Sequence, residues 1–544
     1  MNFFRAPNSL RMCGPALFLA CFLTLPVAAV ANTGQDAASR QFQKTLPLAA
    51  GQTLSIENKF GEIRIHGENS HEAVISATIR SQAGSQSEAE KFVESVQIEV
   101  NQDSQGIRIR TVVPSESPLV LRVGHKNSYS VDYDIAVPSE AKLWVKNAFG
   151  NVDIRGARAW NDVENSHGQL TVRDVGAGKL SNSFGSVEAE GAAGDLTVIN
   201  SNGTVTVSSV KGIVDIKDRF GSITAKNIQG SVTIVGGNGP VEITDAGNSR
   251  VNNSFGPVTA RNIHGSLTVS NNNGAIEANT VSGAADLNGS FGAITFANIT
   301  GHVKCTANNG RVTGGPTGED VYVRNSFGEV SLEQISGGVE IENSNGLISL
   351  REIKGTATLN TSFGAIEASG LRRGVRATTG NGRILLNDMG GDTYAKTSFG
   401  AVTITRVNGN LTIENSNGQV TASSVKGDAS AKTSFASVSL DDIGGNITVD
   451  NQNGAVMLTA ARGSSACKNI SAKTSFSPIQ VRLPESAGYT LTARTSFGRI
   501  NTELPITTSG QVGGDSLTGK IGNGGCTLSL TNSNGSIEIL KLMK

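Results

Sequence analysis

The sequence predicts an all-β protein, an elongated parallel β-solenoid (β-helix), from three observations. The tripeptide Ser-Phe-Gly recurs every 35 or 36 residues, and Ser-Asn-Gly or a close variant falls halfway between, so the period is about 18 residues. Each period holds two segments in which apolar and polar residues alternate, as in half-buried strands. Glycine is abundant, at 65 of 544 residues, whereas aromatic residues make up only 5%. A fixed period of this length is typical of stacked repeats rather than of several globular domains.

One unit, residues 256–274, shows how a period forms one turn of the solenoid, here called a rung. Val258 and Ala260 alternate with polar residues in the first half, and Leu267 begins the same alternation in the second. Gly265, between the halves, predicts a second corner, where a side chain would clash or a positive φ is needed. We expect about seventeen such rungs of about 18 residues, stacked at ~4.8 Å into a body roughly 80 Å long.

The Phe and Asn of the tripeptides occupy one corner of each predicted rung. Counting by twos along the second strand places them on the inward side, next to an inner column of Asn or Thr. We therefore interpret the phenylalanines as buried, each covering a neighbouring rung, and the inner column as a hydrogen-bonded amide ladder that satisfies backbone groups of the turns. The alternative is an exposed phenylalanine stripe on every second rung, which would be an adhesive surface.

The predicted structural corner positions are Phe184, Phe220, Phe255, Phe291, Phe327, Phe363 and Phe399, with Asn202, Asn273, Asn345 and Asn417 between them. The inner column is Asn182, Asn200, Asn253, Asn271, Asn325, Asn343 and Asn415.

The chain divides into four expected segments: a signal peptide at 1–31, an N-terminal β-rich cap region at 32–146, the solenoid repeats at 147–480, and C-terminal rungs and cap at 481–544. In the cap region, alternation predicts strands at 54–57, 63–66, 73–80, 96–101, 107–112 and 131–137. The sequence Ser-Gln-Ser-Glu at 85–88 is a capping box before apolar residues at helical spacing, so one short helix is expected there.

The first 31 residues have the composition of a secretory signal. Basic residues precede an apolar stretch at 16–25, and Ala-Val-Ala at 29–31 is a small-residue processing site. A lipoprotein signal at Cys21 is the alternative, but Phe18 stands where such a signal has leucine. No later run reaches the ~20 apolar residues that span a bilayer. We expect an exported protein, periplasmic or at the cell surface, with no membrane span.

Charge and cysteine content limit the chemistry further. The 46 basic and 46 acidic residues balance and form no long block of one sign, so nothing favours a nucleic acid as partner. Cys305 stands at an apolar repeat position, which predicts a buried free thiol. Cys467 and Cys526 can form a disulfide only if the fold brings them together. No cysteine spacing resembles a metal site, and we expect no metal and no cofactor.

We identify no catalytic residues in the sequence. Glu188, Glu242, Glu277 and Glu367 share one outward position, which leaves a β-helical carbohydrate-active enzyme as a minor alternative. Threonine and serine take that position in the intervening rungs, and uniform rungs lack the loops that enclose a substrate. Such an enzyme would need paired carboxylates within about 10 Å of each other on a concave face.

The two ends of the repeat region resemble a known family. The segments LSIENKFGEIRI at 54–65, VDYDIAVP at 131–138, GKIGNGG at 519–525 and SNGSI at 533–537 are similar to the bacterial DUF4097 proteins, which are described as adhesins or β-strand repeat proteins. The resemblance spans essentially the whole chain after the leader. It implies a β-solenoid of the cell envelope and supplies no catalytic residues.

We therefore expect a non-enzymatic cell-envelope adhesin-like or scaffold protein. Its extended surface would bind an envelope or extracellular protein or a glycan through many weak, equivalent contacts. The main alternative is an envelope sensing or regulatory module with a specific partner site near the N-terminal cap, where Trp144 and Trp160 lie. Against that alternative, both tryptophans are expected to pack at the junction of cap and rod.

Overall fold

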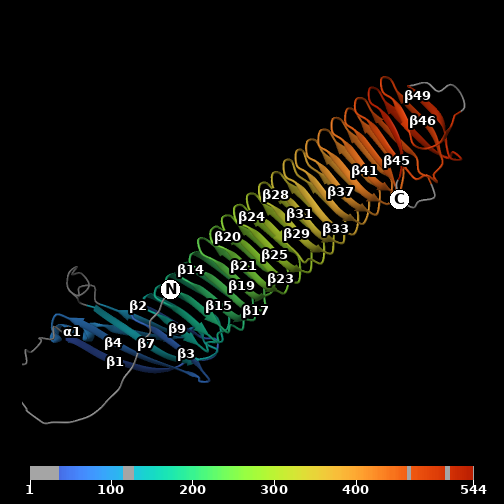
Figure 1. Cartoon of the computed structure of the whole chain (residues 1–544). Coiled ribbons are helices and arrows are strands. Elements are labelled where there is room, and N and C mark those ends of the chain that lie inside the picture. Colours follow the sequence, from blue (N-terminus) through green and yellow to red (C-terminus); the bar gives the residue numbers. More distant parts are fainter. Residues whose placement is uncertain (1–35, 114–127, 462–466, 509–514, 543–544) are drawn as a thin grey trace, which may run out of the picture.

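The computed structural model describes residues 36–113, 128–461, 467–508 and 515–542, so the proposed leader lies outside the described residues. Figure 1 shows a long, straight rod with a broader β-rich cap at its N-terminal end. The described part of the chain is nearly all β, with a solenoid of about 18 turns and a single helix. The predicted β-solenoid is confirmed.

Each rung gives one strand to each of two long parallel sheets. In the middle of the rod, β22 (Leu267–Asn271) pairs in register with β20 (Ser249–Asn253) on one side and β24 (Ala285–Gly289) on the other. In the other sheet, β23 (Ile276–Val281) pairs in the same way with β21 (Val258–Ile263). We call them the even sheet and the odd sheet, after their strand numbers in the rod.

The remaining even-sheet strands of the rod are β8 (Lys142–Phe149), β10 (Asn161–His167), β12 (Gly178–Phe184), β14 (Leu196–Asn202), β16 (Val214–Phe220), β18 (Val232–Gly236), β26 (Val303–Ala307), β28 (Val321–Asn325), β30 (Val339–Asn343), β32 (Ala357–Asn360), β34 (Val375–Thr378), β36 (Thr393–Thr397), β38 (Leu411–Asn415), β40 (Ala429–Thr433), β42 (Ile447–Asn451) and β44 (Ile470–Thr474). The remaining odd-sheet strands are β9 (Val152–Arg155), β11 (Leu170–Arg173), β13 (Val187–Glu190), β15 (Val205–Val210), β17 (Ile223–Ile228), β19 (Val241–Ala246), β25 (Ile294–Ile299), β27 (Val312–Gly314), β29 (Val330–Ile335), β31 (Ile348–Ile353), β33 (Ile366–Leu371), β35 (Ile384–Met389), β37 (Val402–Val407), β39 (Val420–Val425), β41 (Val438–Ile443), β43 (Val456–Ala460) and β45 (Ile479–Leu483).

The space between the two sheets is filled mainly by Val, Ile, Leu and Ala, which alternate with exposed polar residues as the period-2 pattern predicts. Phe296, a large ring inside the rod, shows how tightly neighbouring rungs fit. A Cβ atom on Gly314, in the next rung, would lie only 2.0 Å from that ring. The glycine therefore makes room for the phenylalanine.

In most rungs from β15 to β41 a left-handed residue lies near the end of the odd-sheet strand, usually three positions before the corner glycine. Asn262 has φ +55° and reverses the alternation, so that Ile263 points back into the core. Gly265 itself has no positive φ. A Cβ there would lie 2.3 Å from Oδ1 of Asn248 in the preceding rung, so close stacking is what requires glycine.

The N-terminal cap contains the one helix, α1 (Gln86–Ser95), in the described part of the chain. The Ser85 side chain caps it by accepting a hydrogen bond of 3.3 Å from the Glu88 amide, as predicted. Ala89, Phe92 and Val93 are buried on its inner face. The helix packs against β1 (Asp36–Pro47) and β4 (Glu72–Ala83).

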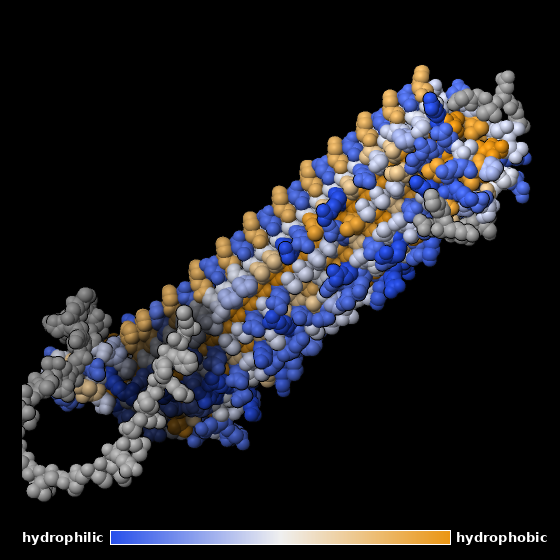
Figure 2. Space-filling model, in the orientation of Figure 1, coloured by the Kyte–Doolittle hydropathy of each residue, from blue (hydrophilic) through white to orange (hydrophobic). Residues whose placement is uncertain are grey.

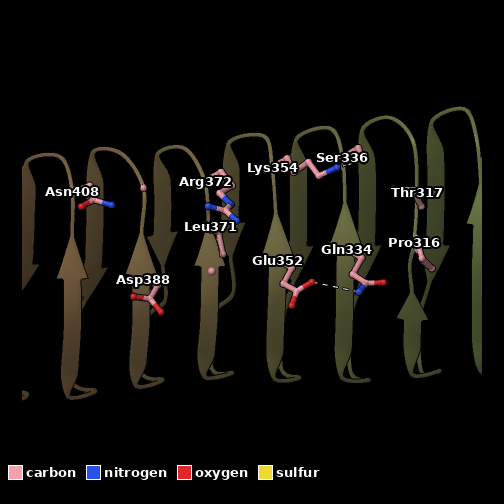
Figure 3. A pocket seen from close by; sticks show the side chains of 12 residues that line it. Pro316, Thr317, Gln334, Ser336, Glu352, Lys354, Leu371, Arg372, Asp388 and Asn408 are labelled. Carbon is pink, nitrogen blue, oxygen red and sulfur yellow. Dashed lines mark hydrogen bonds between the residues drawn. The ribbon is translucent and has the colours of Figure 1, made fainter.

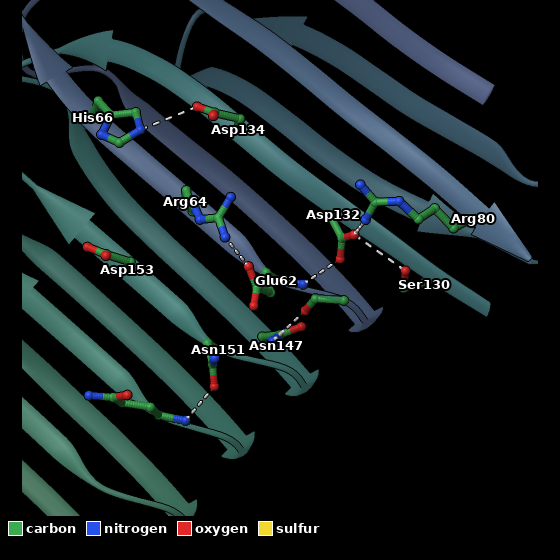
Figure 4. Close-up of polar contacts among 12 residues, drawn as sticks. Glu62, Arg64, His66, Arg80, Ser130, Asp132, Asp134, Asn147, Asn151 and Asp153 are labelled. Carbon is green, nitrogen blue, oxygen red and sulfur yellow. Dashed lines mark hydrogen bonds and ion pairs between the residues drawn. The ribbon is translucent and has the colours of Figure 1, made fainter. Parts of the chain in front are cut away.

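The cap strands are β1 (Asp36–Pro47), β2 (Thr53–Phe60), β3 (Ile63–Glu68), β4 (Glu72–Ala83), β5 (Gln97–Asp103), β6 (Gly106–Val112) and β7 (Ser128–Pro138). All six predicted cap strands are present, and β1, which pairs antiparallel with β4, was not predicted. Figure 4 shows the polar contacts where cap and rod meet. Asp132 accepts from the Glu62 amide (3.0 Å) and pairs with Arg80, and Asp134 faces His66 (3.3 Å).

At the C-terminal end the chain folds back on itself. The strands there are β46 (Tyr489–Thr495), β47 (Ile500–Thr502), β48 (Ile506–Thr507), β49 (Ser516–Ile521), β50 (Cys526–Asn532) and β51 (Ile537–Lys541). β50 and β51, last in sequence, lie between the rung of β44 and β45 and the outermost rung of β46 and β47. A disulfide between Cys467 and Cys526 ties the inserted strand to its neighbour.

Candidate functional site: the corner ridge

The corner between each even-sheet strand and the following odd-sheet strand forms a continuous edge of the rod. In Figure 2 a regular row of hydrophobic knobs runs along this edge. The phenylalanines at this corner are 51% exposed at Phe184, 65% at Phe291 and 63% at Phe363. The interpretation that they are buried is wrong, and the alternative of an exposed stripe holds.

We call this edge the corner ridge. From the first uninterrupted repeat onward, its outermost residues are Phe184, Asn202, Phe220, Asn238, Phe255, Asn273, Phe291, Asn309, Phe327, Asn345, Phe363, Asn381, Phe399, Asn417, Phe435, Asn453, Phe476, Asn534 and Phe497, in spatial order.

Counting by twos failed because the strand ends before the tripeptide. β38 ends at Asn415, which is buried, and Ser416 and Asn417 form a bend. The strict alternation of strand side chains stops at the bend, so Asn417 faces solvent instead of the core. The same holds for the other tripeptides in the middle of the rod.

Beneath the ridge, the inner column of Asn and Thr is buried as predicted. The Asn343 amide nitrogen donates to the carbonyls of Gly328 (3.0 Å) and Gly346 (3.1 Å), and thus joins the turns of two neighbouring rungs. Where threonine takes the position, Thr379 donates through Oγ1 to the Gly364 carbonyl (3.0 Å). The column satisfies backbone groups of the turns, as expected, through bonds from side chain to carbonyl.

The outer asparagines also bond to the preceding turn. Both the backbone N–H and the Nδ2 of Asn273 donate to the Ser254 carbonyl, at 3.0 and 3.2 Å, and Asn345 and Asn417 donate to Ser326 and Ser398 in the same way. These amides lie flat against the corner. The phenylalanine rings on either side therefore stand higher than the asparagines between them, as the knobs in Figure 2 show.

At the N-terminal end the ridge has a different composition. Phe60, Phe149, His167 and Phe184 occupy the corner in four successive rungs. Their rings stack, with centroids 5.0, 4.5 and 4.9 Å apart and planes within 15° of parallel. This stack shows how rings at the corner pack when no asparagine separates them.

The alternation of Phe and Asn follows the spatial order of the rungs, not the order of the sequence. The tripeptides that contain Phe476 and Phe497 follow one another in the sequence, with no Asn-containing tripeptide between them. The inserted C-terminal segment places Asn534 between them, where its amide donates to the Ser475 carbonyl (2.7 Å) and Ser533 accepts from the Phe497 amide (3.0 Å). Simple repetition of a two-rung unit does not produce this arrangement.

The ridge carries almost no charged residues. In the tripeptides of the ridge, from Ser183 to Gly535, the one charged residue is Arg219. Ion pairs lie on the sheet faces instead, such as Arg261 with Glu277 (2.7 Å) and Lys396 with Glu414 (3.0 Å). A neutral, partly apolar edge thus runs along a rod whose faces are charged.

A groove of about 720 Å³ lies beside the opposite corner, along the odd sheet. Figure 3 shows its lining, in which Glu352 accepts a hydrogen bond from Gln334 (3.4 Å). The groove opens because Gly370 stands, in its rung, at the left-handed position that Glu352 and Asp388 hold in the flanking rungs. Its lining carries charges of both signs, with Lys354 donating to Ser336 (3.4 Å) and Asp388 paired with Arg406, and nothing in it selects one ligand chemistry.

The two tryptophans differ in how far their side chains are buried. Trp160 is 47% exposed, so the expectation that it packs at the junction is wrong. Trp144 is partly buried and borders a groove of about 630 Å³ on the cap, together with Glu57, Arg108 and Arg110. This groove lies where the sequence led us to expect a partner site.

The outward carboxylates are not arranged as a catalytic pair. Glu188, Glu277 and Glu367 each form an ion pair with an arginine of an adjacent rung, at 2.9 Å and 2.7 Å for the first two. They lie on the exposed face of the odd sheet rather than in an enclosed cleft. Among the described residues, no group of three or more His, Cys, Asp or Glu side chains is placed to hold a metal ion.

The cysteines have two separate roles. Cys305 is a buried free thiol, as predicted, and burial raises its pKa to about 12. Cys467 and Cys526 are joined by a disulfide, with Cα atoms 5.8 Å apart, which settles the pairing that the sequence left open.

In the part of the chain that the structure describes, no helix is both long and apolar enough to cross a membrane.

Comparisons with known proteins add little. No family model matches the chain, so the resemblance to the DUF4097 family stays an expectation. No curated protein matches it either.

Several solved structures match parts of the chain, and two of them are described here. One is a proposed cell adhesion protein from Clostridium sporogenes, with 8% identity over 41% of this chain and 99% of its own, and a TM-score of 0.18. The other is a proposed adhesin from Bacteroides fragilis, with 12% identity over 60% of this chain and 97% of its own, and a TM-score of 0.16. Because both scores are this low, no function is transferred from them.

Proposed function

We propose that the protein is a non-enzymatic, adhesin-like rod of the cell envelope that binds through its corner ridge. The observation that supports this most is the row of exposed phenylalanines along the ridge. One phenylalanine stands in every second rung from Phe184 to Phe476, and each is more than half exposed. Exposed apolar surface of this extent is costly in a soluble protein and marks interaction sites. Repetition would add many weak contacts into firm binding.

The proposed export supports an envelope setting. A leader at 1–31 would bring the chain into an oxidising compartment, and the disulfide between Cys467 and Cys526 is of the kind that persists there. The partner class remains an envelope or extracellular protein or a glycan, and the neutral ridge does not favour nucleic acid.

The test is an assay of binding to envelope preparations with two variants. Phe291, Phe327, Phe363 and Phe399 are replaced by Ser in the ridge variant, and Val235, Leu385 and Met457, the exposed apolar residues of the sheet faces, are replaced by Ser in the control. The proposal predicts that the ridge variant loses most binding to envelope preparations and that the control keeps it. Equal binding by the ridge variant and the native chain would refute it.

The cap groove is the second candidate. Trp144 and Arg110 border it, and an aromatic ring beside a basic group suits a specific partner. If binding is lost in Trp144→Ala and kept in the ridge variant, the cap and not the ridge is the binding surface.

A further inference from the structure

We propose that the partner of the corner ridge is the corner ridge of a second copy of this chain, paired antiparallel so that the phenylalanines of each copy fill the gaps above the asparagines of the other. The proposal rests on the proposed binding role of the ridge and names its partner. It is built on the spacing, the stacking, the area and the charge of the ridge.

The spacing leaves room for one ring in each gap. Successive ridge phenylalanines are two rungs apart, about 9.6 Å at the usual strand spacing. An asparagine, shorter than phenylalanine, lies between them, and at Asn273, Asn345 and Asn417 its side chain is also bonded to the preceding turn. The space above the asparagine is therefore open. A ring inserted midway would lie about 4.8 Å from the rings on both sides.

The chain itself shows that this distance suits aromatic rings at the corner. In the N-terminal stack, His167 lies between Phe149 and Phe184 with centroid distances of 4.5 and 4.9 Å. Phe149, with rings on both sides, is 41% exposed, whereas Phe363, with asparagines on both sides, is 63% exposed. A ring from a second copy would cover the ridge phenylalanines as neighbouring rings cover Phe149.

Only a partner with the same period can occupy every gap in register. A second copy has that period by construction, and a shift of one rung brings its phenylalanines opposite the asparagines. The fold-back at the C-terminus extends the alternation to the last rung by placing Asn534 between Phe476 and Phe497. An antiparallel pair is related by a two-fold axis, so both copies make identical contacts and the assembly closes as a dimer.

Area and charge permit the pairing. Nine phenylalanines, each 51 to 65% exposed, present roughly 1,000 Å² along the ridge. Covering half of that on each copy reaches the total of about 1,000 Å² that a specific interface needs. The formal net charge is zero, and Arg219 is the one charge in the ridge tripeptides, so two ridges meet without repulsion. We expect affinity in the micromolar range.

The decisive experiment is sedimentation equilibrium of the purified chain, with the proposed leader removed, over a wide range of concentrations. Three variants accompany it: Phe255, Phe291, Phe327, Phe363, Phe399 and Phe435 to Ser; the gap-filled variant with Asn273, Asn309, Asn345, Asn381 and Asn417 to Phe; and the sheet-face control described above. Unfolding midpoints confirm that each variant is folded.

The native chain and the control should pass from one to two chain masses as concentration rises. The Ser variant should bind itself at least about 100-fold more weakly. The gap-filled variant should lose the dimer too, although it is more apolar, because its own rings occupy the gaps. Nonspecific hydrophobic association predicts the opposite for this variant. A native chain that stays monomeric, or a gap-filled variant that dimerises as tightly as the native chain, overturns the proposal.

Orientation is tested by energy transfer between labelled cysteines placed on the outer face of the odd sheet, near opposite ends of the rod. A donor at Thr206→Cys should transfer to an acceptor at Ser439→Cys of another copy, and not to an acceptor at Thr206→Cys. The reverse result overturns the antiparallel arrangement. If the native chain is monomeric but its binding to envelope preparations still requires the ridge phenylalanines, the proposed function stands and its partner is a different molecule.

Discussion

The N-terminal end and the middle of the corner ridge place different neighbours beside the same phenylalanine position. At the N-terminal end Phe149 is stacked between Phe60 and His167, and in the middle Phe363 stands between Asn345 and Asn381. The first is 41% exposed and the second 63%. Neighbouring rings thus cover a corner phenylalanine and neighbouring asparagines leave it open. The comparison shows that this chain can close its ridge with its own rings and does so only at one end.

The corner beneath is the same in both regions. Asn147, under the N-terminal stack, donates to the carbonyls of Gly61 and Gly150 (both 3.2 Å), as Asn343 does to its two glycines. Because the inner amide holds the turn in both regions, we expect the exposed outer residue to contribute less to the fold than the inner one. Either a phenylalanine or an asparagine can therefore stand at the ridge without loss of the turn, and which of them is present can be set by binding.

The largest effect on stability is expected at the C-terminal end of the rod. There the alternation of Phe and Asn on the ridge depends on the insertion of β50 and β51 between two rungs. Replacing Cys467 and Cys526 together by Ser removes a link across 59 residues, worth about 4 kcal/mol in the chain-entropy model. Hydrogen exchange should then rise in β50 and β51, and the gap between Phe476 and Phe497 should lose its asparagine. Unchanged exchange in these strands would show that the insertion does not depend on the disulfide.

The inner and outer asparagines should differ clearly. Asn343→Ala leaves two buried turn carbonyls without their side-chain donor and should cost about 1 to 3 kcal/mol in the free energy of unfolding. Asn345→Ala, two residues later and exposed, should cost less than about 0.5 kcal/mol. Denaturant titration measures both. Equal losses would mean that the outer amide is part of the structural corner.

Asp218 interrupts the inner column with a carboxylate. Burial raises its pKa, while the backbone N–H groups of Arg219 and Phe220 act less strongly in the other direction. The folded state thus holds the proton more tightly than the unfolded state, and the native chain loses stability as pH rises above about 4. Asp218→Asn should stabilise the rod by about 1 kcal/mol at pH 7 and by less at pH 3. A constant difference between these pH values would contradict the assignment.

A substitution at the ridge itself tests the ring stacking directly. Asn345→Phe places a ring between Phe327 and Phe363 and should raise stability by about 0.5 to 1.5 kcal/mol. His167→Asn makes the opposite change at the N-terminal end and should lower stability by a similar amount. Thermal unfolding of both variants gives the comparison. A loss of stability in Asn345→Phe would show that rings do not stack in the middle of the rod.

The repeat was enough to predict the fold, because a period of about 18 residues with two alternating segments has few other solutions. Burial at the corner could not be predicted by counting, since nothing in the alternation marks where β38 stops. One signal was present: the residue two positions before each ridge Phe or Asn is mostly Asn or Thr, and the small residue beside it predicts a bend. The insertion of β50 joins residues far apart in the sequence, so local patterns did not show it.

The central claim is that the ridge phenylalanines are surface residues kept for binding. It is tested most directly by the unfolding free energy and the sedimentation of one variant, with Phe291, Phe327, Phe363 and Phe399 changed to Ser. We predict a stability within about 0.5 kcal/mol per site of the native chain, with self-association lost. A loss of about 3 kcal/mol or more per site, the cost of removing a core phenylalanine, would contradict the claim.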